Sequence, residues 1–207
     1  MKRALILDFG GVLTSNIREA TLGFDRREGL PEGTFMTVVG QHPEGIELFA
    51  QLERGEIGQA EWGERTGALL GVDGTDLLPR VLADLRTEPS VAEAAQRARA
   101  AGVRLALLSN SSGLAPYDSY LGWDLEALFD VVVLSEHHGI AKPDPALYEI
   151  TLQRLGLPGS ECVFVDDTPR NLPPAEALGI ATVLATDPAA TIAQAEALLG
   201  LRLSAEV

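Results

Sequence analysis

Six polar residues of this sequence, each at or shortly after the end of a short apolar run, are suited to chemistry. They are Asp8, Ser109, Asn110, Lys142, Asp166 and Asp167. A carboxylate can attack phosphorus and form a covalent intermediate, and a lysine and a hydroxyl can stabilise the charge that develops on phosphoryl oxygens. Clustered acids repel one another unless a cation keeps them ionised, and Mg²⁺ prefers oxygen ligands. The set therefore suits an anionic group bridged to the protein by a hard cation.

Five apolar runs are predicted to be the buried strands that bring these residues together. They cover residues 4–7, 103–108, 131–134, 162–165 and 181–184. Runs without polar alternation are typical of parallel strands that are covered on both faces. Helical stretches alternate with the runs from about residue 90 onward, which predicts an α/β fold of three layers with a Rossmann-like parallel sheet. Ligands bind at the carboxyl ends of the strands in such sheets, so we expect the six residues to meet in one crevice.

The ends of three helices can be read from capping residues. Ser90 is expected to cap one helix, because Glu93 follows it at the spacing of a capping box. Asp144 and Asp187 each precede a proline and are expected to cap two later helices. We also expect Asn171 to cap the helix that begins near the two prolines after it.

Residues 15–88 contain no convincing strand and show the periodicity of helices instead. Three sets of residues are spaced to share a helix face: Ile46, Phe49 and Leu52; Trp62, Thr66, Leu69 and Leu70; and Leu77, Leu78, Val81, Leu82 and Leu85. We therefore predict that residues 15–88 form a small α-helical cap, inserted into a core domain made of residues 1–14 and 89–207. The first strand must then pair with strands about a hundred residues further along the chain.

Composition excludes several classes of partner. Apolar residues make up 46% of the 207 residues, enough for a sizeable core, and the formal net charge is −14. An acidic excess repels nucleic acids and anionic lipid surfaces, so we expect neither as a partner. Cys162 is the only cysteine, which excludes an internal disulfide and a cysteine-based zinc site. No apolar run has the length of a signal peptide or a membrane span, and the expected location is cytoplasmic.

Four motifs, in order along the chain, resemble those of the haloacid dehalogenase (HAD) superfamily of hydrolases. They are DFGGVLT at residues 8–14, LSN at 108–110, KPDP at 142–145 and FVDDTPRN at 164–171. The resemblance covers the core and implies the HAD fold and a phosphatase-like hydrolase. The cap resembles the family's helical insertions only in position, in helical character and in the stretch LERGEI at residues 52–57.

The resemblance also implies a role for each candidate residue. Asp8 matches the catalytic nucleophile that becomes an aspartyl phosphate, with Lys142 and Ser109 assisting. The implied phosphate-binding residues are Ser109, Asn110, Lys142 and Gly11. The implied cofactor is Mg²⁺, and its expected ligands are Asp8, the Gly10 carbonyl oxygen, Asp167 and, one step further out, Asp166. The expected substrate is a small phosphorylated metabolite, and the expected assembly is a monomer or a homodimer.

One position departs from the family pattern. Most phosphatases that this chain resembles carry a second aspartate two residues after the nucleophile, where it donates a proton to the leaving group; here that residue is Gly10. A positioned general acid contributes about 10²–10⁴-fold. The glycine therefore favours leaving groups that depart unaided, such as those of sugar-1-phosphates, acyl phosphates or anhydrides, or an acid supplied by the cap. It argues against a phosphomutase.

Two other functions are compatible with these motifs. A 2-haloacid dehalogenase-type hydrolase shares the aspartate nucleophile but needs no metal, and the adjacent acids Asp166 and Asp167 look like the phosphatase version of the fourth motif. A catalytically silent binding or regulatory domain could keep the fold and lack the acid at Gly10. His137 and His138 are adjacent and therefore point apart, so we expect a polar loop there and not a metal site.

Overall fold

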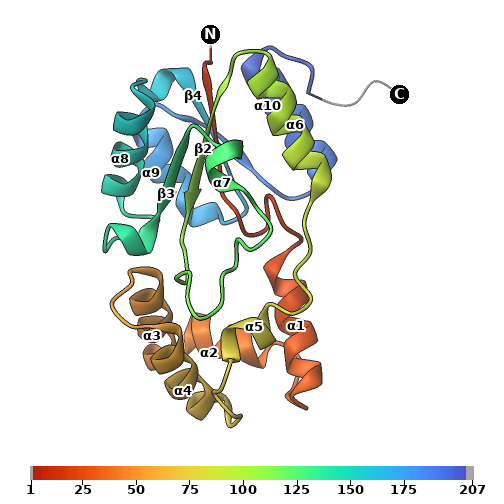
Figure 1. Cartoon of the computed structure of the whole chain (residues 1–207), viewed down its shortest axis with the longest axis vertical. Helices are drawn as coiled ribbons and strands as arrows, with labels where there is room; N and C mark the ends of the chain where they lie inside the picture. Colours follow the sequence, from red (N-terminus) through yellow and green to blue (C-terminus); the bar gives the residue numbers. More distant parts are fainter. Residues whose placement is uncertain (1, 204–207) are drawn as a thin grey trace.

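The core is a sheet of five parallel strands. The computed structural model describes residues 2–203, and its strands are β1 (Ala4–Leu7), β2 (Arg104–Ser109), β3 (Val131–Leu134), β4 (Cys162–Asp166) and β5 (Ala181–Leu184). Their order in the sheet is β3-β2-β1-β4-β5, so β1 lies in the centre between strands that are distant in sequence (Figure 1). All five predicted strands are present. Two of them extend one residue further than predicted, so that Ser109 and Asp166 end their strands.

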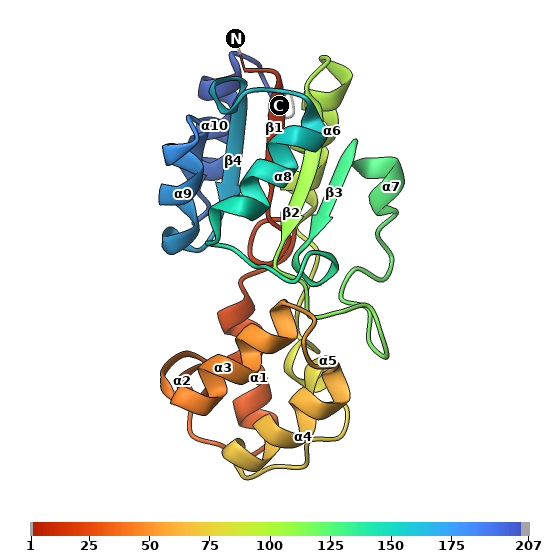
Figure 2. The same cartoon turned by 90° about the vertical axis from the view of Figure 1, so that its left-hand side faces the viewer.

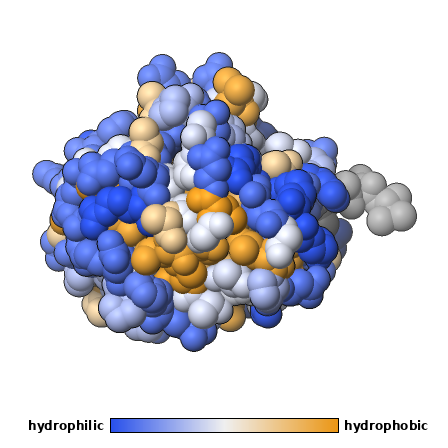
Figure 3. All heavy atoms as spheres, turned by 90° about the horizontal axis from the view of Figure 1, so that it is seen from below, coloured by the Kyte–Doolittle hydropathy of each residue, from blue (hydrophilic) through white to orange (hydrophobic). Residues whose placement is uncertain are grey.

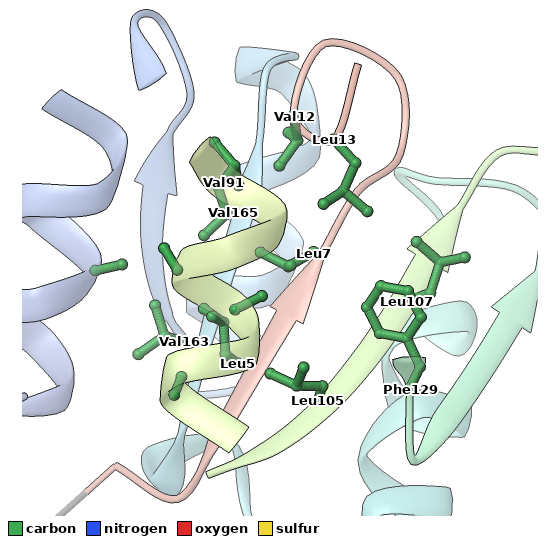
Figure 4. Close-up of a cluster of buried hydrophobic side chains, with 14 of the residues drawn as sticks. Leu5, Leu7, Val12, Leu13, Val91, Leu105, Leu107, Phe129, Val163 and Val165 are labelled. Carbon is green, nitrogen blue, oxygen red and sulfur yellow. The ribbon is translucent and has the colours of Figure 1, made fainter. Parts of the chain in front are cut away.

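Successive residues of β1 point to opposite faces of the sheet, and both faces are covered by helices. Leu5 and Leu7 pack in one hydrophobic cluster with α6 (Pro89–Ala100) and α10 (Pro188–Leu199), and Figure 4 shows this cluster in front of the sheet. Ala4 and Ile6 pack on the other side with α8 (Pro145–Leu155) and α9 (Leu172–Ala177). The predicted α/β fold of three layers, with helices on both faces of a parallel sheet, is confirmed.

Of the caps expected at Ser90, Asp144 and Asp187, the last two are confirmed and the first is wrong. The side chain of Asp144 accepts a hydrogen bond from the Ala146 amide at the start of α8. The side chain of Asp187 accepts one from the Ala190 amide at the start of α10. Ser90, in contrast, lies inside α6. The helix begins at Pro89, whose ring suits a first helical position, so the cap lies two residues earlier, at Glu88.

Five helices lie between β1 and α6 and form a separate bundle beneath the sheet (Figures 1 and 2). They are α1 (Ile17–Arg27), α2 (Thr34–Gln41), α3 (Pro43–Glu53), α4 (Gln59–Leu70) and α5 (Leu77–Val81). They enclose their own hydrophobic cluster, in which Trp62 is fully buried between Phe35 and Phe49. Because this cluster shares no residue with the two that cover the sheet, the bundle is stabilised mainly by its own contacts.

Two details of the predicted cap helices are wrong. Ile46 lies on the solvent side of α3 and is 46% exposed, because Leu48 and Leu52 form the buried face of that helix. Helix α5 ends at Val81, so Leu82 and Leu85 lie in the following turn, where the Leu85 amide donates to the Leu82 carbonyl oxygen.

The two chain segments that join the bundle to the core lie side by side. Thr14 and Thr87 form an antiparallel bridge, the Ser15 amide donates to the Arg86 carbonyl oxygen at 2.7 Å, and the Glu88 amide donates to the Leu13 carbonyl oxygen at 2.8 Å. The chain therefore enters and leaves the bundle at one point.

The surface of the bundle that faces away from the sheet is mostly hydrophilic, with an apolar area near its middle (Figure 3). The large hydrophobic side chains that α1–α5 leave exposed are Met36 and Ile46. Among residues 2–203, no helix combines the length and apolar character needed to cross a lipid bilayer.

Candidate active site

A buried lysine joins two carboxylates at the carboxyl end of the sheet. The Lys142 ammonium nitrogen lies 2.8 Å from Asp8 Oδ1 and 2.7 Å from Asp166 Oδ2, and the lysine side chain is only 1% exposed. It also donates to the Leu108 carbonyl oxygen at 3.0 Å. Since buried charges are costly unless paired, this arrangement holds the ammonium group in one position beside Asp8.

Three carboxylates converge on one point. Asp8, Asp166 and Asp167 each offer an oxygen, and these atoms lie within 4.8 Å of one another. Because β1 and β4 are neighbours in register, with Leu7 paired to Val165, the residues that follow them come together at the same edge. An all-oxygen set of this size fits a hard divalent cation such as Mg²⁺.

Asp166 has the fewest lone pairs to spare among the three. Its Oδ1 accepts from the Thr168 amide at 2.8 Å, and the Asn171 side-chain nitrogen lies 3.0 and 3.1 Å from its two oxygens. Together with the Lys142 bond, these contacts saturate a carboxylate that is fully buried. Asp166 is therefore placed to fix the lysine and the following loop, whereas Asp8 and Asp167 each keep one oxygen, Oδ2, without a described hydrogen bond.

The electrostatics of the site favour a bound cation. Burial raises the pKa of Asp8 from 3.8 to about 7; Lys142 opposes the rise and the charge of Asp166 adds to it. Burial also raises the pKa of Asp167, again with a contribution from Asp166. Burial alone would lower the pKa of Lys142, but Asp8 and Asp166 reverse this, so its pKa is raised. The protein thus makes two carboxylates costly to ionise, and a divalent cation would remove that cost.

Glycine at position 11 is required by its backbone and by its neighbour. Gly11 has φ +72°, and a Cβ atom there would lie 2.1 Å from Asp167 Oδ2, so any side chain would displace that carboxylate. The Gly11 amide, expected to bind phosphate, donates to Thr14 Oγ1 at 3.1 Å in this structure. Its neighbour Gly10 is limited by Ile17, whose Cδ1 would lie 2.5 Å from a Cβ.

Ser109 and Asn110 lie at the end of β2 and have different surroundings. Ser109 is buried, and its oxygen accepts a hydrogen bond of 2.9 Å from the Tyr120 hydroxyl. This leaves the serine proton free to be donated elsewhere. The Asn110 side chain accepts from the Lys142 amide at 2.8 Å and donates to the Lys142 carbonyl oxygen at 3.1 Å. Asn110 therefore holds the loop that carries the lysine.

The structure brings all the sequence-predicted polar residues to one edge of the sheet, and it adds others. Asn171 does not cap α9 through its side chain. Its side chain donates to Asp166 instead, because the turn of η3 (Pro169–Asn171) brings it back to that carboxylate, five residues earlier in the chain. Its place in the fourth motif could have indicated this. Tyr120 lies in a loop without periodicity, and nothing in the sequence pointed to its contact with Ser109.

Comparisons with known proteins agree with this geometry. A family model described as haloacid dehalogenase-like hydrolase matches residues 2–179. Acyl-CoA dehydrogenase family member 10 of Mus musculus is 34% identical over 212 residues; the match covers 97% of this chain but only 19% of that protein. A phosphorylated carbohydrates phosphatase of Thermotoga maritima is 25% identical over 178 residues, covering 86% of this chain and 72% of that one. The structure of a HAD-like family hydrolase from Porphyromonas gingivalis superimposes with a TM-score of 0.70 at 25% identity, covering 89% and 91% of the two chains.

Proposed function

Because the chain belongs to the haloacid dehalogenase-like hydrolase family, we propose that it is a phosphatase that uses Asp8 as a covalent nucleophile. The observation that carries this proposal is the Lys142 ammonium group, held 2.8 Å from Asp8 beside a cluster of three carboxylates. The name of the Thermotoga maritima relative supports a phosphorylated small molecule as the substrate class.

In the proposed reaction, the phosphoryl group is transferred twice. A carboxylate oxygen of Asp8 attacks phosphorus, the bond to the ester oxygen breaks, and an aspartyl phosphate forms. Water then attacks the same phosphorus and returns the electron pair to Asp8. Lys142 and the free proton of the Ser109 hydroxyl lie where they can stabilise charge on the phosphoryl oxygens.

The proposed cofactor is Mg²⁺, with Asp8, Asp167 and the Gly10 carbonyl oxygen as its protein ligands. When bound, it would neutralise the phosphoryl group as a Lewis acid. Asp166 would act one step removed, by holding Lys142 and the loop of Asn171. We further propose that helices α1–α5 serve as the cap that covers this site and shapes its pocket.

The dehalogenase alternative predicts activity without metal. A cluster of three acids, in which burial and the charge of Asp166 raise the pKa of Asp8 and of Asp167, has little use in an enzyme that needs one ionised aspartate. The silent-domain alternative predicts no turnover at all. Both alternatives can therefore be separated from a phosphatase by one assay.

The test is hydrolysis of an activated aryl phosphate by the wild type and by Asp8→Asn, with Mg²⁺ or with excess chelator. We expect turnover only in the wild type with Mg²⁺, and a phosphorylated Asp8 peptide after an acid quench. Asp187→Asn is the matched control, since it changes an exposed capping aspartate of α10 to another good cap. Equal turnover in the wild type and Asp8→Asn, or none in either, would refute the proposal.

A further inference from the structure

Gly10 leaves the reaction without an obvious proton donor for the leaving group. A glycine has no side chain to donate, and the ester oxygen of an ordinary alcohol leaves slowly as an alkoxide. A general acid is worth about 10²–10⁴-fold in such a step. If the protein hydrolyses alkyl phosphates, the proton must come from another group near Asp8.

One acidic residue of the helical bundle is anchored through its backbone at the edge of the sheet where Asp8 lies. Glu53 is the last residue of α3, and its carbonyl oxygen accepts a hydrogen bond from the hydroxyl of Ser135. Ser135 begins η1 (Ser135–His137), directly after β3. In Figure 2 the upper end of the bundle lies just below the lower, carboxyl ends of the strands. The end of α3 is thus fixed to the core beside the candidate active site.

The Glu53 carboxyl group is close enough to the loop of Lys142 to be affected by it. The side chain of Asn110 and the charges of Arg170 and Lys142 all lower its pKa. Asn110 in turn bonds the Lys142 backbone at 2.8 and 3.1 Å, and the Lys142 ammonium group contacts Asp8. Glu53 is therefore linked to the nucleophile through two residues, Asn110 and Lys142, on the side of the site that the bundle covers.

The surroundings of Glu53 favour its protonated form. Burial raises its pKa above the ordinary value of 4.5, and the rise is opposed first by the Asn110 bond and then by Arg170, Lys142 and Arg54. One further acidic residue on this side is Glu136 of η1, whose backbone and Cβ lie next to Gly55. A carboxyl whose pKa lies above the usual range can give up a proton closer to neutral pH, as a general acid must.

We propose that Glu53 is the general acid and base that replaces the missing group at Gly10, an inference that rests on the proposed phosphatase function. As Asp8 forms its bond to phosphorus, the bond from phosphorus to the ester oxygen breaks and that oxygen takes the electron pair and the Glu53 proton, leaving as a neutral alcohol. In the second step the Glu53 carboxylate takes a proton from the attacking water, and phosphorus leaves Asp8 as inorganic phosphate. Glu53 is then protonated again for the next cycle.

The experiment compares Glu53→Gln with the wild type on two substrates, dinitrophenyl phosphate and a simple alkyl phosphate, in the presence of Mg²⁺. The measured quantity is kcat/KM, since it reports only the steps through release of the first product. We expect a loss of about 10²-fold or more on the alkyl phosphate and a change of only a few-fold on the dinitrophenyl ester, whose oxygen needs no proton. The fall of kcat/KM as the pH rises through the pKa of Glu53 should also disappear in Glu53→Gln for the alkyl substrate.

Two control variants isolate the role of this carboxyl group. Glu56→Gln removes an exposed carboxylate of the same segment, which pairs with Arg54, and should leave both substrates unchanged. Glu136→Gln tests the other carboxylate on this side of the site. The inference is overturned if Glu53→Gln lowers kcat/KM equally for both substrates, or for neither. It is also overturned if Glu136→Gln shows the selective loss on the alkyl phosphate instead.

Failure of the proposed function has a different signature, because it would appear as full activity of Asp8→Asn on both esters. Circular dichroism and the melting temperature check that each variant is folded. Should Glu53→Gln not fold, Glu53→Asp keeps the charge but shortens the reach. It should still lose more activity on the alkyl than on the aryl ester, and equal losses would overturn the inference.

Discussion

Replacing Asp8 by asparagine is expected to make the metal-free protein more stable at about pH 8, although the same change removes the proposed nucleophile. The pKa of Asp8 in the folded protein is raised from 3.8 to about 7 by burial, with a further contribution from Asp166. A group whose pKa is raised by folding destabilises the folded state as the pH rises, because the folded form must then hold a charge that it disfavours. The penalty is absent below pH 3.8, grows between that value and about 7, and is complete above it.

The size of the effect follows from the same shift. One pKa unit corresponds to about 1.4 kcal/mol, so ionising Asp8 in the folded protein costs at most about 4 kcal/mol. Asparagine resembles the protonated acid and removes this cost, but it leaves Lys142 with Asp166 as its one charged partner. We therefore expect the free energy of unfolding to increase by about 1–3 kcal/mol. For a chain of this size, that raises the melting temperature by roughly 3–10 °C.

The assay is thermal and urea unfolding of the wild type, Asp8→Asn and the control Asp187→Asn, with excess chelator, across the acid to neutral range. The gain in stability of Asp8→Asn over the wild type should be largest above pH 7 and should vanish near pH 4. Asp187→Asn should show no such pH-dependent gain. If Asp8→Asn is less stable than the wild type at every pH, then Asp8 stabilises the fold as an ordinary ion pair, and the argument from its burial is refuted.

Three more predictions concern the same site. Excess Mg²⁺ should stabilise the wild type, by about 2.7 kcal/mol at a hundredfold excess over its dissociation constant, and Asp167→Asn should lose this gain in a thermal shift assay. Tyr120→Phe removes the hydrogen bond to Ser109, worth about 1 kcal/mol, and should lower kcat about fivefold with little change in KM, while the melting temperature falls by only about 2–4 °C. Gly10→Asp alone should give only a small gain in turnover of alkyl phosphates, because the new Cβ meets Ile17. Gly10→Asp combined with Ile17→Ala should give a larger gain in steady-state assays. Equal gains would show that Ile17 moves aside freely.

The sheet could be predicted because its signal is local and strong. Each strand is an apolar run, and Asp144 and Asp187 mark helix starts by a proline that follows them. The error at Ser90 arose because a capping-box spacing and a first-turn proline compete, and Pro89 decides the start. Helices α1 and α2 were not predicted individually; α2, for example, follows Gly33, which has no side chain to mark the start of a helix.

The polar residues of the site could be predicted as a group because parallel strands bring their carboxyl ends to one edge. The hydrogen bonds that these residues form could not be predicted from the sequence. Asn171 returns to Asp166 through a turn of η3, and Tyr120 reaches Ser109 from a loop. The link from Glu53 to Asn110 depends on how the bundle meets the core. Such contacts are set by tertiary geometry, which periodicity does not encode.

The central position of β1 has a consequence for the way the chain is made. Ala4 pairs with Arg104 on one side and with Cys162 on the other, so the first strand to leave the ribosome is among the last to find both neighbours. At roughly 5–20 residues per second, synthesis of the intervening chain takes on the order of 10 s. Until β4 is made, the apolar β1 keeps at least one unpaired edge in the nascent polypeptide, and an unpaired apolar edge is prone to pair with another chain.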